Sequence, residues 1–327
     1  MNRSLVLEDD VHGVPDDDEL TREQALRDGI TLSQASKWTT VANIVNNVIG
    51  SGLLVLPWAL SQSSAIPGLL MLTVIGSFST ASLQMLASAC ERTKVFTIEA
   101  LWTRAWGRER GDWTARVVNF VFLCFAYPLS YPVLVGNFMS PVLRNWFGQD
   151  HFLSQRNVIV IGSTALLMVP LSLLPNLSSL RHVSSLGIVS VAFVAILVLA
   201  TTIENGIADS FEWFRLDFGI FVAMGIMNMA YACHFNGPRL YGEMRHRTPS
   251  KFGGVALLSI GSCLLVYGTS ALSGYMQFGE DVCGDVLSSL PGDGWLFALA
   301  RVLMSIVAIL LPLGPIWTQR FSAANEP

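Results

Sequence analysis

The sequence predicts an all-α membrane protein, and three observations support this fold class. Hydrophobic residues make up 52% of the 327 residues and charged residues only 13%, whereas soluble domains carry about 25% charged residues. The charges are confined to short blocks between long neutral runs, and a membrane-spanning helix needs roughly 20 apolar residues. Eight such helices fit the charge-poor runs, which are 38–90 (two spans with a turn at 61–64), 117–143, 157–180, 183–203, 218–238, 252–279 and 302–319.

The basic residues predict the orientation of these spans. If the N-terminus lies in the cytosol, four of the 20 Lys and Arg fall in outer segments, namely Arg144, Arg156, Arg215 and Arg301. All the others fall in inner segments. Because cytosolic loops are enriched in Lys and Arg, we expect a cytosolic N-terminus.

The chain divides into three parts by composition. Residues 1–36 hold nine Asp or Glu against three Arg and lack an apolar run, so we expect an acidic, disordered cytosolic tail. This tail is either regulatory or a passive solvated leader. Residues 37–321 form the expected transmembrane bundle, and residues 322–327 form a short polar end.

The first span is expected to break at its centre. Residues 46–52 end in Gly50-Ser51-Gly52, and Pro57 follows; glycine and proline both weaken a helix. Unpaired backbone groups are tolerated in a membrane only where they line a cavity or a binding site. The freed amides of the second half-helix suit a carboxylate, and the freed carbonyls of the first suit a cation. The alternative is a glycine-rich packing face or a simple kink.

The sixth span is expected to break as well. Asn236 suits a helix N-cap and Pro238 suits a first helical turn, so we expect a helix that stops near residues 231–234 and restarts near Asn236. Two broken helices five spans apart are typical of an inverted repeat with its substrate site where the breaks meet. His234, inside this run, is either a histidine bonded to a carbonyl or a gate or proton-carrying group.

Enzyme chemistry finds no support in the sequence. The five cysteines and five histidines do not form a zinc-site pattern. The chain contains no Gly-x-Ser-x-Gly elbow, phosphate loop or His-Glu-x-x-His motif. We therefore expect no catalytic residues, no resident cofactor or metal and no nucleic-acid partner.

Four linked segments resemble one family. They are Asn46-x-x-x-Gly50-Ser51-Gly52-Leu53-Leu54-x-Leu56-Pro57, then Cys233-His234-x-Asn236 with Tyr241-x-Glu243-Met244, then Gly274-Tyr275-Met276-x-Phe278-Gly279, and finally Arg301 to Pro312. This ordered set resembles the amino acid/auxin permease family, and within it the vacuolar and lysosomal neutral amino acid transporters. The resemblance implies a leucine-transporter-type, inverted-repeat bundle of eleven helices, which we expect to be truncated here after eight spans. It also implies that residues 49–53 bind the amino acid backbone and that Asn46 takes part in cation coupling.

The resulting expectation is ion-coupled secondary transport of neutral amino acids across a lipid bilayer by alternating access. The alternatives are an amino acid sensor or binding protein of the same fold, or an inactive truncated variant. The expected substrate-binding residues are Ile49, Gly50, Ser51, Gly52, Leu53, Tyr127, Tyr131, Tyr231 and Phe235.

The expected ion-coupling residues are Asn46, His234 and Ser305, with Asn46 as the candidate sodium ligand. Protons are slightly favoured over sodium, because Ser305 is the one hydroxyl in residues 302–312 of the eighth span and no carboxylate lies in the middle of any span. The short outer loop 204–217 has no cysteine and no glycosylation sequon. Plasma-membrane relatives in the family often carry a long modified loop there, so a vacuolar or lysosomal membrane is favoured over the plasma membrane.

Overall fold

The computed structural model describes residues 32, 34–50, 52–107, 111, 113–114, 117–118, 127–173, 181–291 and 293–310. The expectations for the acidic tail before residue 32 and for the polar end 322–327 lie outside the described residues. Within the described ranges every regular element is helical, apart from one isolated parallel bridge between Ala35 and Met244. The all-α expectation is confirmed for this part of the chain.

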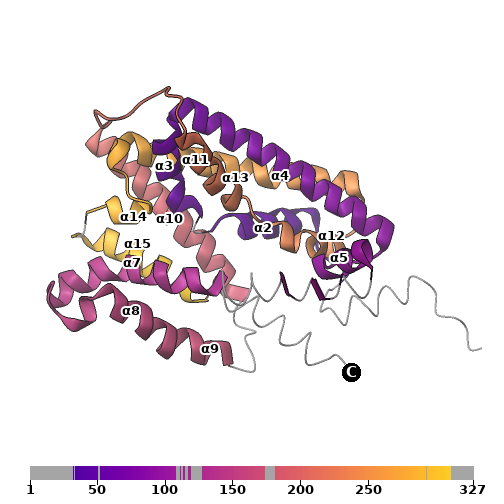
Figure 1. Cartoon of the computed structure of the whole chain (residues 1–327), viewed down its shortest axis with the longest axis horizontal. Helices are drawn as coiled ribbons and strands as arrows, with labels where there is room; N and C mark the ends of the chain where they lie inside the picture. Colours follow the sequence, from indigo (N-terminus) through magenta and orange to yellow (C-terminus); the bar gives the residue numbers. More distant parts are fainter. Residues whose placement is uncertain are drawn as a thin grey trace, which may run out of the picture.

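The elements follow the order of the predicted spans (Figure 1). The helices are α2 (Lys37–Val48), α3 (Gly52–Ser63), α4 (Ala65–Thr93), α5 (Ile98–Trp106), α7 (Tyr127–Phe147), α8 (Arg156–Ser163), α9 (Val169–Leu173), α10 (Arg181–Asn205), α11 (Gly219–Ala230), α12 (Gly237–Glu243), α13 (Pro249–Phe278), α14 (Val286–Ser289) and α15 (Trp295–Leu310). Short turns of other helix types are η2 (Phe152–Ser154), the π-helical η3 (Thr164–Met168), η5 (His234–Asn236) and η6 (Gly279–Asp281).

Several of these helices are long and apolar enough to cross a membrane. Helix α4, residues 186–205 of α10, and α13 with η6 meet this test singly, and α2 with α3 meets it as one span bent by 60°. Residues 156–171 and α15 are shorter apolar helices. The described residues therefore hold three such helices, or four with the bent pair, and the expected number of eight stays a prediction.

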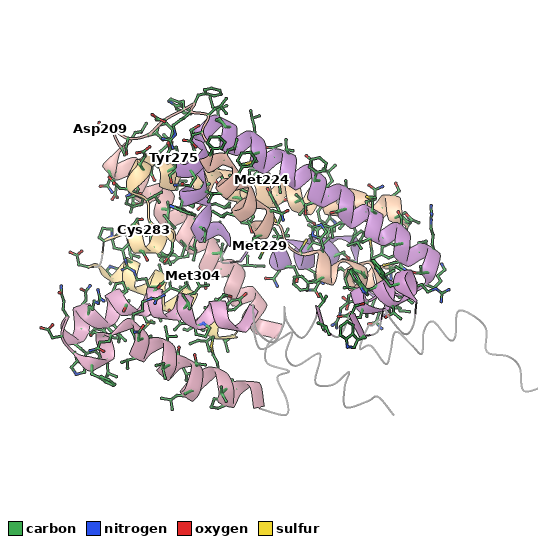
Figure 2. All side chains as sticks on the ribbon, in the orientation of Figure 1. Asp209, Met224, Met229, Tyr275, Cys283 and Met304 are labelled. Carbon is green, nitrogen blue, oxygen red and sulfur yellow. The ribbon has the colours of Figure 1, made fainter. Side chains whose placement is uncertain are left out.

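The outward faces of the long helices are apolar. Exposed large hydrophobic side chains follow one another along α4, α10, α11 and α13, among them Leu70, Val74, Phe78, Met85, Ile196, Ile203, Phe221, Met224, Met229, Leu257 and Leu265. Figure 2 labels Met224 and Met229, which both lie on α11. Apolar patches of this extent on a protein surface mark a membrane or a partner, and on α4, α10 and α13 they cover helices of membrane-spanning length.

Helix α13 is the central packing element of the fold. It packs against α2, α3, α4 and α10, and Figure 1 shows it running beside α4. Thr248 caps its first turn by accepting a hydrogen bond from Lys251 N at 3.3 Å, and Pro249 follows the cap, as expected for a strong helix start. Because α13 touches both halves of the first span, it can link the two halves to other elements.

The turn expected in the first double run is confirmed at Ser64. This residue has φ +62°, between the end of α3 and the start of α4. Gly68 lies inside the first turns of α4, where a Cβ would stand 2.4 Å from Ser63 Oγ. The glycine therefore lets the two helices meet closely at this turn.

Arg301 corrects the sequence prediction. We expected it in an outer loop before a span that begins at residue 302, but α15 begins at Trp295 and buries Arg301 to 1% exposure. The guanidinium donates to Pro291 O at 3.1 Å and to Leu287 O and Leu290 O at 2.9 Å. These carbonyls end the short helix α14 and lack helical partners, and arginine supplies several donors at once. The Arg301 guanidinium therefore forms its hydrogen bonds inside the fold and not in an outer loop.

Arg215 organises the loop between α10 and α11. It forms ion pairs with Glu212 at 3.1 Å, with Asp217 at 2.7 Å and with Glu280, and donates to Ser61 O at 2.9 Å. The hydrogen bond to Glu280 and the other two carboxylates raise the pKa of Arg215 above its ordinary value. The loop is thereby tied to the end of α3 and to η6.

Candidate functional site

The first break lies where the sequence predicts it. Helix α2 ends at Val48 and α3 begins at Gly52, with their axes bent by 60°. The last amide interaction of α2 runs from Ile49 N to Val45 O at 2.7 Å, and Leu53 N donates to Gly50 O at 3.3 Å. The expected discontinuous first helix is therefore confirmed, while Ser51 lies outside the described residues.

The second break is confirmed as well. Helix α11 ends at Ala230, the turn η5 follows, and α12 begins at Gly237. Asn236 occupies the N-cap position as expected, but its side chain makes no capping hydrogen bond. It instead donates from Nδ2 to Asn47 Oδ1 at 2.5 Å. The expected capping role of the Asn236 side chain was wrong, because this side chain bonds Asn47, which lies 189 residues away in the chain.

The two breaks lie against each other. A Cβ built on Gly52, the first residue of α3, would stand 3.1 Å from Ala230 Cα, the last residue of α11. The bond between Asn47 and Asn236 joins the same two breaks through side chains. The backbone groups freed at both breaks are therefore brought to one place, as the spacing of the broken spans predicts.

Tyr267 on α13 joins the two breaks from a third helix. Its side chain is fully buried, and its hydroxyl lies 2.5 Å from Val48 O and 3.1 Å from Ala230 O. These carbonyls belong to the last residues of α2 and α11, whose helical partners are missing. Because a tyrosine hydroxyl has one proton, it donates to one carbonyl at a time and holds both half-helix ends near the same atom.

The sequence reasoning missed Tyr267. The available signal was a single tyrosine within the apolar run 252–270, since a buried tyrosine hydroxyl usually requires a hydrogen-bond partner. The identity of that partner was not available from the sequence, because Val48 and Ala230 lie 219 and 37 residues away.

Helix α4 supports the second break. His234 Nε2 and Ser82 Oγ are 2.5 Å apart, and Ser79 Oγ donates to Tyr231 O at 3.5 Å. His234 is half-buried. Its ring contacts the Ser82 hydroxyl and also forms a hydrogen bond with the backbone of Ser79, so the expectation of a carbonyl-bonded histidine and that of a proton-carrying group both stay predictions. The sequence reasoning did not single out Ser79 or Ser82, which are three residues apart and therefore share one helix face.

The substrate-binding residues expected in the first break fall at the junction. Ile49 and Gly50 are half-buried and Leu53 is fully buried. A Cβ on Gly50 would meet no heavy atom within 4 Å. Open space therefore lies beside Gly50, whereas Gly52 is tightly packed.

The expected aromatic wall is only partly assembled. Tyr231 is buried at the second break, and its hydroxyl makes no hydrogen bond to a described residue. Phe235 is 48% exposed. Tyr131 packs in a separate cluster with Val135, Met168 and Ala308, so the structure does not bring it to Tyr231. The side chain of Tyr127 lies outside the described residues.

The expected coupling residues are dispersed. Asn46 is half-buried in the last turn of α2. Ser305 is buried in α15, which packs against α7 and α10, and its hydroxyl donates to Arg301 O at 2.7 Å. Asn46 and His234 therefore lie at the breaks, whereas the Ser305 hydroxyl bonds a carbonyl of its own helix.

Asn236→Ala is expected to weaken the junction. The variant leaves Asn47 Oδ1 without its donor, and losing such a partner costs about 1–2 kcal/mol. In a double-mutant cycle with Asn47→Ala, thermal unfolding of the detergent-solubilised protein should show a coupling of about 1 kcal/mol. Asn228→Ala, an exposed position on α11, is the matched control and should shift the midpoint little. Additive effects of the two junction variants would contradict the bond.

Comparison with known proteins identifies a matching family and relatives of this chain. The family model described as "Transmembrane amino acid transporter protein" matches residues 33–313. Vacuolar amino acid transporter 2 of Saccharomyces cerevisiae is 26% identical over 305 residues, which cover 88% of this chain and 61% of that protein.

Two further relatives show the same level of similarity. Amino acid transporter AVT6E of Arabidopsis thaliana is 27% identical, covering 77% of this chain and 54% of that protein. Putative sodium-coupled neutral amino acid transporter 11 of Danio rerio is 27% identical, covering 76% of this chain and 56% of that protein. The chain thus spans less than two thirds of the length of each relative. Since the family model covers most of the chain and both broken helices, the chain belongs to the transmembrane amino acid transporter family.

Proposed function

We propose that this protein carries neutral amino acids across a membrane by ion-coupled secondary transport, with alternating access around the two breaks. The observation that carries the proposal is the junction of α2–α3 with α11–α12, where Tyr267 lies within hydrogen-bond distance of both half-helix ends. Discontinuous helices that meet in this way are how transporters offer backbone groups to a substrate and a coupling ion. We further propose that these broken helices are equivalent members of an inverted repeat within eight spans.

The amino acid carboxylate is assigned to the start of α3. Helix N-termini attract anions through their free amides and their dipole, and the space beside Gly50 leaves room for a small group. Tyr231, buried at the second break, supplies an apolar ring and a hydroxyl that makes no hydrogen bond within the described part of the chain.

The preference for neutral side chains follows from the charges. No Asp or Glu occurs in residues 46–53 or 230–237, so a lysine or arginine side chain would enter without a counter-charge. Such an unpaired charge is costly inside a membrane protein. The relative from Danio rerio is named as a neutral amino acid transporter, which agrees with this substrate class.

Transport of this class is tested in proteoliposomes that contain the purified chain. Uptake of labelled leucine, alanine or glutamine driven by an ion gradient is the expected result, with labelled arginine near background. Ligand-dependent thermal stabilisation without uptake would instead indicate a sensor. Tight arginine binding would overturn the assigned selectivity.

The location is proposed to be a vacuolar or lysosomal membrane with the N-terminus in the cytosol. One relative is named as vacuolar. The bridge between Ala35 and Met244 sets the start of α2 beside the basic loop 245–247. Both therefore share a side of the membrane, which agrees with the rule that basic loops remain cytosolic.

Coupling is proposed to use protons, with His234 as the titrating group. The Ser82 hydroxyl lies 2.5 Å from its Nε2 and can offset part of the desolvation of a charged imidazole. His234→Gln should therefore flatten the pH profile of uptake, while His151→Gln, an exposed position, should leave the profile unchanged.

Sodium coupling predicts the opposite dependence of uptake on sodium and on pH. If sodium drives uptake, Asn46→Ala should raise the sodium requirement and leave the pH profile alone, because Asn46 lies at the cation-favouring end of α2. Uptake that depends on sodium and ignores pH in both variants would overturn the proton assignment.

A further inference from the structure

An open cleft of about 410 Å³ lies at the turn between α12 and α13, lined by Glu91, Arg245, His246 and Arg247. Arg245 and His246 are exposed. Glu91 accepts hydrogen bonds from Lys94 Nζ at 2.7 Å and from Tyr241 Oη at 2.5 Å, so its charge is balanced by a lysine beside the cleft. The lining groups together with Lys94 therefore carry a net positive charge.

The cationic side of this cleft is held in place by the fold. The Arg247 guanidinium lies over the ring of Phe96, 4.6 Å from its centroid, and donates to Gly242 O at 3.1 Å. Lys251 Nζ donates to His246 O at 3.3 Å, which brings a further positive charge to the same turn. A cleft with pre-positioned cations suits an anionic ligand, because little ordering is left to occur on binding.

The N-terminal segment enters at this cleft. Ala35 N donates to Glu243 O and Arg245 N donates to Ala35 O, both at 2.8 Å, so the chain before Ala35 starts beside Arg245. That stretch carries nine acidic residues, Glu8, Asp9, Asp10, Asp16, Asp17, Asp18, Glu19, Glu23 and Asp28, against Arg3, Arg22 and Arg27. At about 3.4 Å per extended residue, these acidic residues can reach the cleft. A short tether also gives an effective concentration on the order of millimolar.

We propose that this cleft is the docking site for the chain's own acidic N-terminal segment, residues 8–28. A docked segment links α2, which begins at Lys37, to α12, which ends at Glu243. These are the half-helices on the same side of the two breaks, and the segment therefore opposes their separation. That consequence rests on the proposed function, whereas the docking itself does not.

The docking is tested on the full chain with a carbodiimide, which joins carboxylates to amines. The chain has three lysines, Lys37, Lys94 and Lys251, and the last two lie beside the cleft. Mass spectrometry of the protein in phosphatidylcholine nanodiscs should find links from residues 8–28 to Lys94 or Lys251. The link between Glu91 and Lys94 serves as an internal control, because these residues form an ion pair within α4 and its cap.

The effect of charge on the yield of the links distinguishes docking from chance proximity. Arg245→Glu, and to a smaller extent Arg245→Gln, should lower the yield of the tail links about fivefold, as should about 500 mM NaCl. Arg144→Glu makes the same charge change at an exposed position on α7 and should have no effect. The Glu91–Lys94 link should persist in all variants.

Three results would overturn the proposal. The first is the absence of links from residues 8–28 to Lys94 and Lys251. The second is a yield of these links that Arg245→Glu leaves unchanged. The third is Arg245-dependent binding of an inositol phosphate head group without these links, which would assign the cleft to lipids. Replacing Asp16, Asp17 and Asp18 with Asn should lower the yield of links from the remaining carboxylates of residues 8–28 and speed uptake. Links without any uptake in proteoliposomes would contradict the proposed transport and leave the docking intact.

Discussion

Gly52→Val is expected to abolish amino acid binding and uptake. A Cβ at this position would stand 3.1 Å from Ala230 Cα and 3.2 Å from Ala230 Cβ, and a backbone atom cannot move aside as a flexible side chain can. The branched side chain would force α3 away from α11 at the point where the two breaks meet. Overpacking of this kind costs about 1–3 kcal/mol in stability. Uptake in proteoliposomes and ligand-dependent thermal stabilisation measure the two effects.

Gly225→Val is the matched control for this prediction. Gly225 lies on α11, as Ala230 does, but it is exposed and a Cβ there would meet nothing within 4 Å. The control should therefore retain uptake. Gly52→Ala should be intermediate, because a single methyl group requires its neighbours to shift by only a few tenths of an ångström. Unchanged affinity in Gly52→Val would remove the substrate site from this junction.

Tyr267→Phe is expected to raise the KM for uptake and to lower the thermal midpoint. The variant keeps the ring but removes the hydroxyl near Val48 O and Ala230 O. A buried carbonyl left without a donor costs about 1–3 kcal/mol. Without the hydroxyl, α13 no longer holds the two half-helix ends together, and the binding geometry between them loosens.

Tyr275→Phe separates this role from general stability. Tyr275 lies on the same helix, is fully buried and is labelled in Figure 2. Its hydroxyl accepts a hydrogen bond from Glu212 N at 3.1 Å, in the loop before α11 and away from the breaks. The control should lower the thermal midpoint and leave KM unchanged. Equal effects of the two variants on KM would mean that Tyr267 only stabilises the fold.

The positions of the breaks were predictable because they depend on local chemistry. Gly50 and Gly52 weaken one helix, and Pro238 favours the restart of another, wherever the rest of the chain lies. Composition and the spacing of charges likewise determine the membrane class, because the bilayer selects long apolar helices with satisfied backbone groups. Those properties require no knowledge of which helices are neighbours.

The partners across the breaks depended on packing. Asn236 looked like an N-cap and bonds Asn47 instead, and His234 faces Ser82 from another helix. Tyr131 shares an expected role with Tyr231 but lies in a different cluster. Side-chain partners 150 or more residues apart are set by the rotation and depth of each helix, which periodicity does not specify.

Arg301 shows most clearly the difference between what neighbouring residues predict and what packing determines. Its charge made an outer loop the natural expectation, yet the structure buries it against three carbonyls at the end of α14. The all-helical class, the two breaks and the acidic composition of residues 8–28 can be read from the sequence, since each follows from the properties of neighbouring residues. The position of Tyr267 between the breaks, the burial of Arg301 and the place of Ala35 beside the basic cleft came from the fold, because each depends on contacts between segments far apart in the chain.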